Sequence, residues 1–171
     1  MVIELPEPCL VVLVGAAGAG KSTLAARLFA RDEVLSSDAQ RALLTGDEAD
    51  QAVTKTAFAI LHRQLARRMA AGRTTVVDAT NVTSFARRSL VRRATAAGVP
   101  SVAIVLDLAP ELVMARNATR LGRIVPEAAV RRQLADLARS LRRGDLESDG
   151  FAAVHHIRTE AELDELQLAR R

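Results

Sequence analysis

The sequence predicts one α/β domain, in which helices cover both faces of a parallel sheet. Three observations lead to this class. Short apolar runs alternate along the 171 residues with segments of helical periodicity. A glycine-rich phosphate-binding motif directly follows the first of the predicted strands. With 49% hydrophobic residues, a chain of this length closes one full core and is too short for two ordinary domains, so we expect residues 1–171 to form a single domain.

Five apolar runs are predicted to be the strands of the sheet. The first is apolar throughout, as expected of a central parallel strand with both faces covered. The five runs are Leu10–Val14, Val34–Leu35, Thr74–Val77, Val102–Leu106 and Ala153–Ile157. Acidic residues follow three of them, at Asp38, Asp78 and Asp107. Because ligands bind beyond the carboxyl ends of parallel strands, these carboxylates and the phosphate-binding motif are expected to gather at one edge of the sheet.

Helices are predicted between the strands from apolar spacing and from capping residues. The expected helices follow the phosphate-binding motif and then cover Ala39–Leu44, Asp47–Gly72, Ser84–Ala97, Pro110–Arg120, a stretch opened by Pro126 that carries Val130, Leu134, Leu137 and Leu141, and a last helix behind the capping box Thr159–Glu162. The segment between Gly144 and Gly150 is acidic and contains glycine, so it is predicted to be an exposed loop.

The phosphate-binding motif spans Gly15 to Ser22 and fits G-x-x-x-x-G-K-[ST] at each constrained position. Its glycines allow backbone N–H groups to point at an anion, Lys21 reaches the β- and γ-phosphates, and the Ser22 hydroxyl holds Mg²⁺. The predicted nucleotide-binding residues here are Gly15, Ala16, Ala17, Gly18, Ala19, Gly20, Lys21, Ser22 and Thr23. The motif therefore predicts ATP or another nucleoside triphosphate, together with Mg²⁺, as ligands.

Asp38 begins an Asp-x-x-Arg unit that ends at Arg41, just after the second strand. A carboxylate at this place can accept a proton from an attacking hydroxyl, while Arg41, about one helical turn away, can bind an anionic part of the acceptor. The same spacing fits a simple helix cap at Asp38, and the two roles are compatible.

Asp78 follows an apolar strand, as in the Walker B pattern, where the carboxylate holds Mg²⁺ directly or through water. Asp107 fits this loose pattern nearly as well. We take Asp78, with Ser22, as the predicted Mg²⁺ site. Asn81 either shapes its loop or contacts substrate, and the sequence does not choose between these roles.

Arg116, Arg120 and Arg123 recur at intervals of four and three residues, which places them on one side of a helix. Directed at a nucleotide, they would neutralise charge on the transferring phosphoryl group, and one such arginine is worth about 10³ to 10⁵ in rate. A solvated helix face explains the same spacing in a chain whose usual cation is arginine. Spacing alone favours this second explanation.

The composition restricts the partners of the chain. A net charge of +4 favours polyanions, although arginine-richness can equally reflect genome composition, since only Lys21 and Lys55 of the 24 basic residues are lysines. Four phenylalanines, with no tyrosine or tryptophan, leave little surface for base stacking, so a bound nucleic acid would be held mainly by its backbone. The lack of a long apolar run, with Glu4 and Glu7 near the start, predicts a cytoplasmic protein without membrane contact. Cys9 is expected to be a small buried hydrophobe.

Together these motifs resemble the kinase module of bacterial polynucleotide kinase-phosphatase repair enzymes and, more distantly, the phage polynucleotide kinase. The matching stretches are Val11–Gly15 through Lys21–Leu24, Ser36–Asp38 with Arg41, Asp50–Gln51 with Val53–Thr54, Val76–Val82, and Arg116–Asn117 with Arg120 and Arg123. Many ATPases share the phosphate-binding motif, but the Ser-Asp-x-x-Arg unit combined with Asp-Ala-Thr-Asn and the arginines is much more specific.

The resemblance implies transfer of the γ-phosphate of ATP to the 5′-hydroxyl of DNA or RNA, in nucleic-acid end healing and repair. It implies Asp38 as the general base, Arg41 on the 3′-phosphate of the acceptor, and Gln51 as a further acceptor contact. The implied fold is a P-loop kinase-like three-layer sandwich with the sheet order 2-3-1-4-5. Such modules often precede a phosphatase domain and sometimes a ligase, which implies a larger parent protein.

On the donor side, the resemblance implies that Arg116, Arg120 and Arg123 form a lid over the nucleotide, at about residues 116–130. Arg116 would then act in catalysis together with Lys21. The most similar competing function is a P-loop kinase of a small metabolite, antibiotic or nucleotide sugar. A nucleotide-dependent switch is a further alternative, but the guanine-reading motif Asn-Lys-x-Asp is absent. The sequence does not choose between DNA and RNA as the acceptor, and it does not specify the base of the nucleotide donor or the oligomeric state.

Overall fold

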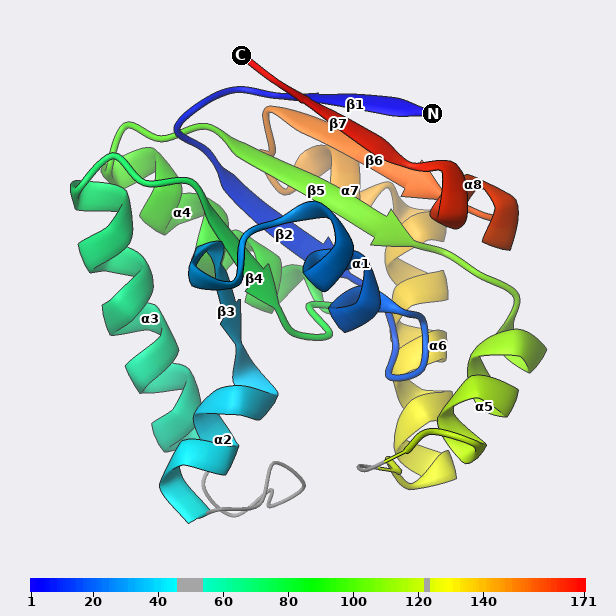
Figure 1. Cartoon of the computed structure of the whole chain (residues 1–171). Coiled ribbons are helices and arrows are strands. Elements are labelled where there is room, and N and C mark those ends of the chain that lie inside the picture. The colour runs from blue at the N-terminus through cyan, green and yellow to red at the C-terminus, as the bar shows by residue number, and fades with distance from the viewer. Residues whose placement is uncertain (46–53, 122–123) are drawn as a thin grey trace.

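A parallel five-stranded sheet forms the centre of the protein (Figure 1). The computed structural model describes residues 1–45, 54–121 and 124–171. The strands are β2 (Leu10–Val14), β3 (Val34–Ser36), β4 (Thr75–Asp78), β5 (Ser101–Leu106) and β6 (Ala153–Ile157). Their order across the sheet is β3-β4-β2-β5-β6. Numbered as the five predicted strands, this order is 2-3-1-4-5, so the predicted sheet is confirmed.

Helices cover both faces of this sheet, which confirms the three-layer class. The helices are α1 (Lys21–Leu28), η1 (Arg31–Glu33, a 3₁₀ turn), α2 (Ser37–Thr45), α3 (Thr54–Ala70), α4 (Ser84–Ala96), α5 (Pro110–Ala118), α6 (Glu127–Arg143), α7 (Asp145–Ser148) and α8 (Glu160–Glu165). None of the helices in the described ranges is both long and apolar enough to cross a bilayer.

The central strand β2 shows why a strand of this core has an apolar residue at each position. Val11 and Leu13 pack with residues of α1 and α8, whereas Leu10, Val12 and Val14 pack with residues of α3, α4 and α7. Successive side chains of a strand point to opposite faces, so a strand covered on both faces must be apolar at each position. Every residue of β2 is buried.

A second, two-stranded parallel sheet joins the two ends of the chain, and the sequence analysis did not predict it. β1 (Val2–Leu5) pairs with β7 (Gln167–Arg170). Figure 1 shows the two termini running side by side above the main sheet. Ile3 and Leu5 are buried against the core while Val2 and Glu4 are exposed, which is the alternation of a half-buried strand. The four-residue pattern is too short to stand out without its distant partner.

The prediction of an exposed loop from Gly144 to Gly150 is wrong. This stretch forms α7, in which Leu146 is fully buried, and the following Asp149 is only 5% exposed. Asp149 forms an ion pair of 2.6 Å with Arg87, whose side chain is fully buried. A buried guanidinium requires a carboxylate, and removing one partner of such a pair typically costs about 3 to 5 kcal/mol. Asp149 is therefore a partner in a buried ion pair, while Glu147 of the same stretch is exposed.

Most of the predicted helix boundaries hold within a few residues. The expected cap at Asp47 lies outside the described residues, and the helix is described from Thr54 onward. The predicted buried cysteine is confirmed, since Cys9 has no exposed surface and burial raises the pKa of its thiol to about 11. Thr159 caps α8 by the predicted capping box with Glu162.

Candidate functional site

A pocket of about 590 Å³ lies at the carboxyl-terminal edge of the sheet. It combines residues of the phosphate-binding motif, of β4, of α2, and of the α5–α6 region. Its lining residues are Ala17, Gly18, Gly20, Lys21, Ser22, Thr23, Leu24, Arg27, Ser37, Asp38, Phe58, Asp78, Ala79, Thr80, Arg116, Arg120, Val125, Gln133, Leu163 and Asp164. This is the edge at which the sequence predicted the phosphate-binding motif and the carboxylates to meet.

The phosphate-binding motif forms a tight loop between β2 and α1, and two glycines in it have no substitute. A Cβ atom on Gly18 would lie 2.5 Å from the carbonyl oxygen of Val113, so the loop could not pack against α5. Gly20 precedes α1 with a φ of 98°, a conformation that favours glycine. Behind the lining residues of this loop, Gly15, Ala16 and Ala19 are buried.

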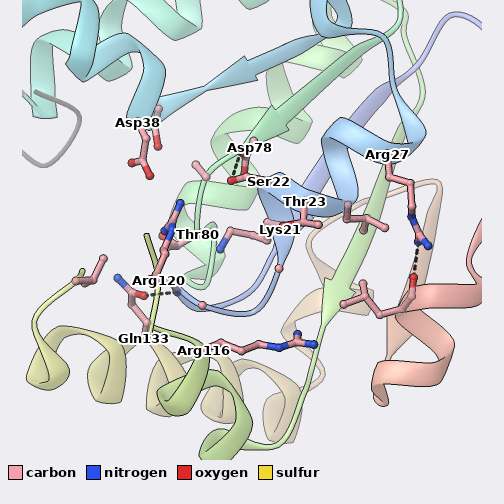
Figure 2. Close-up of a pocket in the computed structure, with 18 of the residues that line it drawn as sticks. Lys21, Ser22, Thr23, Arg27, Asp38, Asp78, Thr80, Arg116, Arg120 and Gln133 are labelled. Atoms are coloured by element: carbon pink, nitrogen blue, oxygen red, sulfur yellow. Dashed lines mark hydrogen bonds between the residues drawn. The ribbon is translucent and has the colours of Figure 1, made fainter. Parts of the chain in front are cut away.

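Lys21 lies at the mouth of this loop and is only 8% exposed (Figure 2). Its Nζ donates hydrogen bonds of 2.9 Å to the carbonyl oxygens of both Gly15 and Ala16. These bonds hold the ammonium group against the loop and within the pocket, where its charge is partly shielded from water. Here a bound phosphate would face both the ammonium and the loop N–H groups.

Ser22 and Asp78 meet in the middle of the pocket. The Ser22 hydroxyl donates a 2.7 Å hydrogen bond to Oδ2 of Asp78, a residue that is only 6% exposed (Figure 2). A hydroxyl and a carboxylate this close supply the oxygen ligands that Mg²⁺ takes, with its other positions left to water and phosphate. The residues present therefore fit the predicted Mg²⁺ site. Asp107, which fitted the Walker B pattern nearly as well, is not among the residues that line the pocket.

Asp38 lies in the first turn of α2 and lines the same pocket. Figure 2 shows its carboxylate pointing into the pocket, on the side away from Arg116. Arg41 follows in α2, and nothing is described of its side chain. The predicted acceptor contact Gln51 lies outside the described residues.

Arg116 and Arg120 enter the pocket from α5 and from the residue that follows its C-cap. The Arg116 guanidinium pairs with Glu160 of α8 and lies beside the phosphate-binding loop, 3.7 Å from the position of a Cβ on Gly20. The spacing of four therefore brings both arginines into the pocket. Arg123, the third of the series, lies outside the described residues.

Asn81 shapes the loop after β4. It is buried with a φ of 48°, and its Nδ2 donates hydrogen bonds to the carbonyl oxygens of Leu13 (2.8 Å) and Ala79 (3.3 Å). A backbone hydrogen bond of 2.9 Å, from the Gly15 N–H to the Thr80 carbonyl oxygen, also connects this loop to the phosphate-binding loop. Of the two roles left open for Asn81, the structure supports loop shaping.

Sequence reasoning missed several residues that complete the site. Oε1 of Gln133, in α6, accepts a 2.8 Å hydrogen bond from the backbone N–H of Ala17. Asn117 is buried and binds the backbone of Val125 through both its amide nitrogen and its amide oxygen. These contacts tie α6 and the end of α5 to the phosphate-binding loop. The Gln133 contact joins residues far apart in the sequence, whereas Asn117 and Val125 are eight residues apart. Only the polar Asn117 within an arginine stripe gave any signal.

The electrostatics divide the pocket into two sides. One side carries the cations Lys21 and Arg116 beside the phosphate-binding loop, which suits a polyanionic ligand. The other side carries Asp38, at the start of α2. An arrangement of this kind can bind a polyphosphate while it holds a carboxylate ready to accept a proton from a second ligand.

Comparison with known proteins identifies the family to which this chain belongs. The model of one protein family, described as an AAA domain, matches residues 10–143, well over half of the chain. No curated protein matches the sequence.

Solved structures agree on the fold. A protein of the Pnkp1/Rnl/Hen1 RNA repair complex superposes with a TM-score of 0.70 at 23% identity, over 81% of this chain and 47% of that one. The chain thus spans about half the length of that protein. A gluconokinase from Sinorhizobium meliloti 1021 gives 0.57 at 18% identity, over 94% and 88% of the two chains. The AvrRxo1-ORF1:-ORF2 complex with ATP gives 0.64 at 16% identity, over 83% and 50%. At these identities the likeness establishes the α/β fold of P-loop kinases.

Proposed function

We propose a reaction for this chain on one premise: it belongs to the AAA domain family matched above, AAA_33, and its fold is that of the P-loop kinases. The proposed reaction transfers the γ-phosphate of ATP, or of another nucleoside triphosphate, to the 5′-hydroxyl end of DNA or RNA. The observation that carries the proposal is that Asp38 and the phosphate-binding loop line one pocket.

On the donor side, Lys21 and the loop N–H groups would bind the triphosphate. Lys21, Arg116 and Arg120 would meet the negative charge that grows on the transferring phosphoryl group, since pre-organised charges of this kind cost no rearrangement during the reaction. Ser22 and Asp78 would hold Mg²⁺, which neutralises phosphate charge when it is bound.

On the acceptor side, Asp38 would accept the proton of the attacking hydroxyl. As this O–H bond breaks, the oxygen forms a bond to the γ-phosphorus and the bond from that phosphorus to the β-phosphate oxygen breaks, which leaves a nucleoside diphosphate. The reaction balances with no further reactant. Arg41 would bind a 3′-phosphate of the acceptor.

A polynucleotide is the acceptor that the sequence supports best. The Asp-x-x-Arg unit at Asp38 and the Asp-Ala-Thr-Asn sequence at Asp78 resemble the polynucleotide kinase module, and a protein of an RNA repair complex superposes well. Healing of nucleic-acid ends is the corresponding biological role, and a phosphatase or ligase in a larger parent protein would fit it.

A small polyol or sugar acid is the second candidate acceptor. The observation that favours it is the gluconokinase, whose fold matches nearly the full length of both chains. Such a kinase would use the same donor side and an aspartate base.

The deciding experiment offers both kinds of acceptor with γ-labelled ATP and Mg²⁺. The proposal expects label on an oligonucleotide with a 5′-hydroxyl and none on the same oligonucleotide with a 5′-phosphate. Label on gluconate or on a member of a sugar panel, with none on oligonucleotides, would replace the proposal by the second candidate. A 3′-phosphorylated oligonucleotide serves as the acceptor that Arg41 should favour.

A further inference from the structure

The outer faces of α3 and α4 carry basic residues without any acidic neighbour on the same helices. Neither the 17 residues of α3 nor the 13 of α4 include an aspartate or a glutamate. Between residues 54 and 106, Asp78 is the sole carboxylate in the sequence, and it is buried in the pocket. The exposed cations of these two helices that form no ion pair in the described ranges are Lys55, Arg63, Arg67, Arg92 and Arg93. We call these five residues the α3–α4 cationic face.

Elsewhere on the surface the exposed arginines are only partly compensated: Arg31, Arg132, Arg142, Arg143 and Arg158 form no ion pair in the described ranges, whereas other arginines lie beside carboxylates. In α6, Arg131 pairs with Glu127 over 2.6 Å and Arg139 pairs with Asp136 over 2.9 Å. At the chain termini, Arg170 pairs with both Glu7 and Glu33. Carboxylates are thus available in this chain, and α3 and α4 are the long helices that carry none.

α3 and α4 cover the same face of the sheet, because Leu61 of α3 and Leu90 of α4 belong to one core cluster. Arg93 of α4 lies close enough to His62 of α3 to lower the pKa of that histidine, in addition to the effect of burial. Like charges gathered in this way repel each other, and nothing in the described protein offsets the repulsion. A bound polyanion would offset it.

The cationic face begins at the acceptor side of the pocket. Phe58 of α3 lines the pocket together with Asp38, and Lys55 lies one turn before it on the exposed side. Figure 1 shows α3 starting beside α2 and running along one flank of the sheet. Along this flank, exposed Ala59 and Ala66 separate the cations, so small side chains leave room for a chain of phosphates to approach.

We propose that the α3–α4 cationic face binds the phosphodiester backbone of a single-stranded nucleic acid whose 5′ end lies in the pocket. The inference rests on the proposed function for the identity of that strand, which is the acceptor. Arg63 and Arg67 are four residues apart, about 6 Å along the helix axis, so they contact neighbouring phosphates of one strand. The contacts are to the backbone, so the face binds without sequence preference and its affinity falls with salt.

The test compares two double variants with the same loss of charge. Arg63→Ala with Arg67→Ala removes two residues of the face, whereas Arg131→Ala with Arg139→Ala removes two exposed but paired arginines of α6. Fluorescence anisotropy gives the Kd of a 20-nucleotide single-stranded DNA with a 5′-hydroxyl at several salt concentrations, without ATP. Competition by a 5′-hydroxyl dinucleotide gives the affinity of the pocket alone. Thermal unfolding checks that both variants are folded.

The face variant should bind the 20-mer roughly 10- to 30-fold more weakly at 0.1 M salt, and the slope of log Kd against log salt should fall by about 1.4, because each lost contact to single-stranded nucleic acid removes about 0.7. The dinucleotide should bind as it does to the wild type, and the α6 variant should keep nearly the full slope. Three results would each overturn this proposal: equal salt slopes in the two variants, a dinucleotide affinity that falls as much as that of the 20-mer, or no binding of the 20-mer by the wild type.

Phosphorylation assays of the same proteins keep this result separate from the proposed function. If the 20-mer binds through the face but accepts no phosphate, the proposed binding surface is supported and the proposed reaction is rejected. A 20-mer that is phosphorylated equally well at all salt concentrations by the wild type and the face variant supports the reaction and rejects the surface.

Discussion

The two sides of the pocket differ in how they are built. On the donor side, three polar groups are held by neighbours that the fold itself supplies: Lys21 by two loop carbonyls, Ser22 by Asp78, and Arg116 by Glu160. On the acceptor side, Asp38 stands at the start of α2, a helix of nine residues. The donor side is thus pre-organised for an invariant ligand, a triphosphate. We expect changes at Asp38 to alter the turnover of the acceptor more than nucleotide binding.

The largest effect that separates the two sides is expected from Asp38→Asn. This change keeps the shape of the side chain and removes its negative charge, so it should lower kcat by about 10² to 10⁴. In phosphoryl transfer through a loose transition state, the proton leaves the attacking hydroxyl late. The fall in kcat can therefore be smaller than about 10⁴. ATP affinity, measured by titration calorimetry, should stay within about twofold of the wild type. Parallel loss of ATP affinity and turnover would show that Asp38 belongs to the donor side.

Lys21→Ala should give the next largest effect, and on the opposite side. Its ammonium group faces the charge that develops on the phosphates, so the rate should fall by about 10² to 10³ for every acceptor alike. The circular dichroism spectrum and the melting temperature should stay close to those of the wild type. Turnover near that of the wild type would show that this loop is not the donor site.

Arg116→Ala tests whether the arginines of α5 serve the donor. Arg116 already pairs with Glu160, so part of its charge is neutralised, and we expect turnover to fall by roughly 10². Arg142→Ala provides the matched control, because Arg142 is an exposed arginine in the last turn of α6, away from the pocket lining. If the two changes have small and equal effects, the arginine series is better explained as a solvated helix face.

The sequence predicted where the phosphate-binding motif and Asp78 lie in the fold, because the signals for both are local. The phosphate-binding motif is contiguous, and the apolar strand before Asp78 places that carboxylate at the same edge of the sheet. The strand order came from the family resemblance, and the structure confirms it. Spacing alone favoured a solvated face for Arg116 and Arg120, and only the fold brings them to the loop.

What could not be predicted depends on contacts between distant segments. The buried pair Arg87–Asp149 turned an expected loop into part of the core, and the pairing of β1 with β7 joins the two ends of the chain. In each case one partner alone carries an ambiguous pattern: an aspartate in an acidic stretch, or four residues of alternating polarity. The acceptor contact at Gln51 falls outside the described residues, and its role stays a prediction.

The smallest effect we predict is that of Gln133→Ala, and it tests how far pre-organisation of the donor side matters. Gln133 contacts the loop from α6 through one hydrogen bond to the N–H of Ala17, and this bond leaves that N–H turned toward α6. A neutral hydrogen bond is worth about 0.5 to 1.5 kcal/mol net, so its loss should raise the KM for ATP by roughly two- to tenfold through a looser loop. The KM for the acceptor should not change, because Gln133 acts through the loop. A lowered KM for ATP in Gln133→Ala would instead mean that the bond competes with phosphate for the Ala17 N–H, and that the donor side is held partly closed to its ligand.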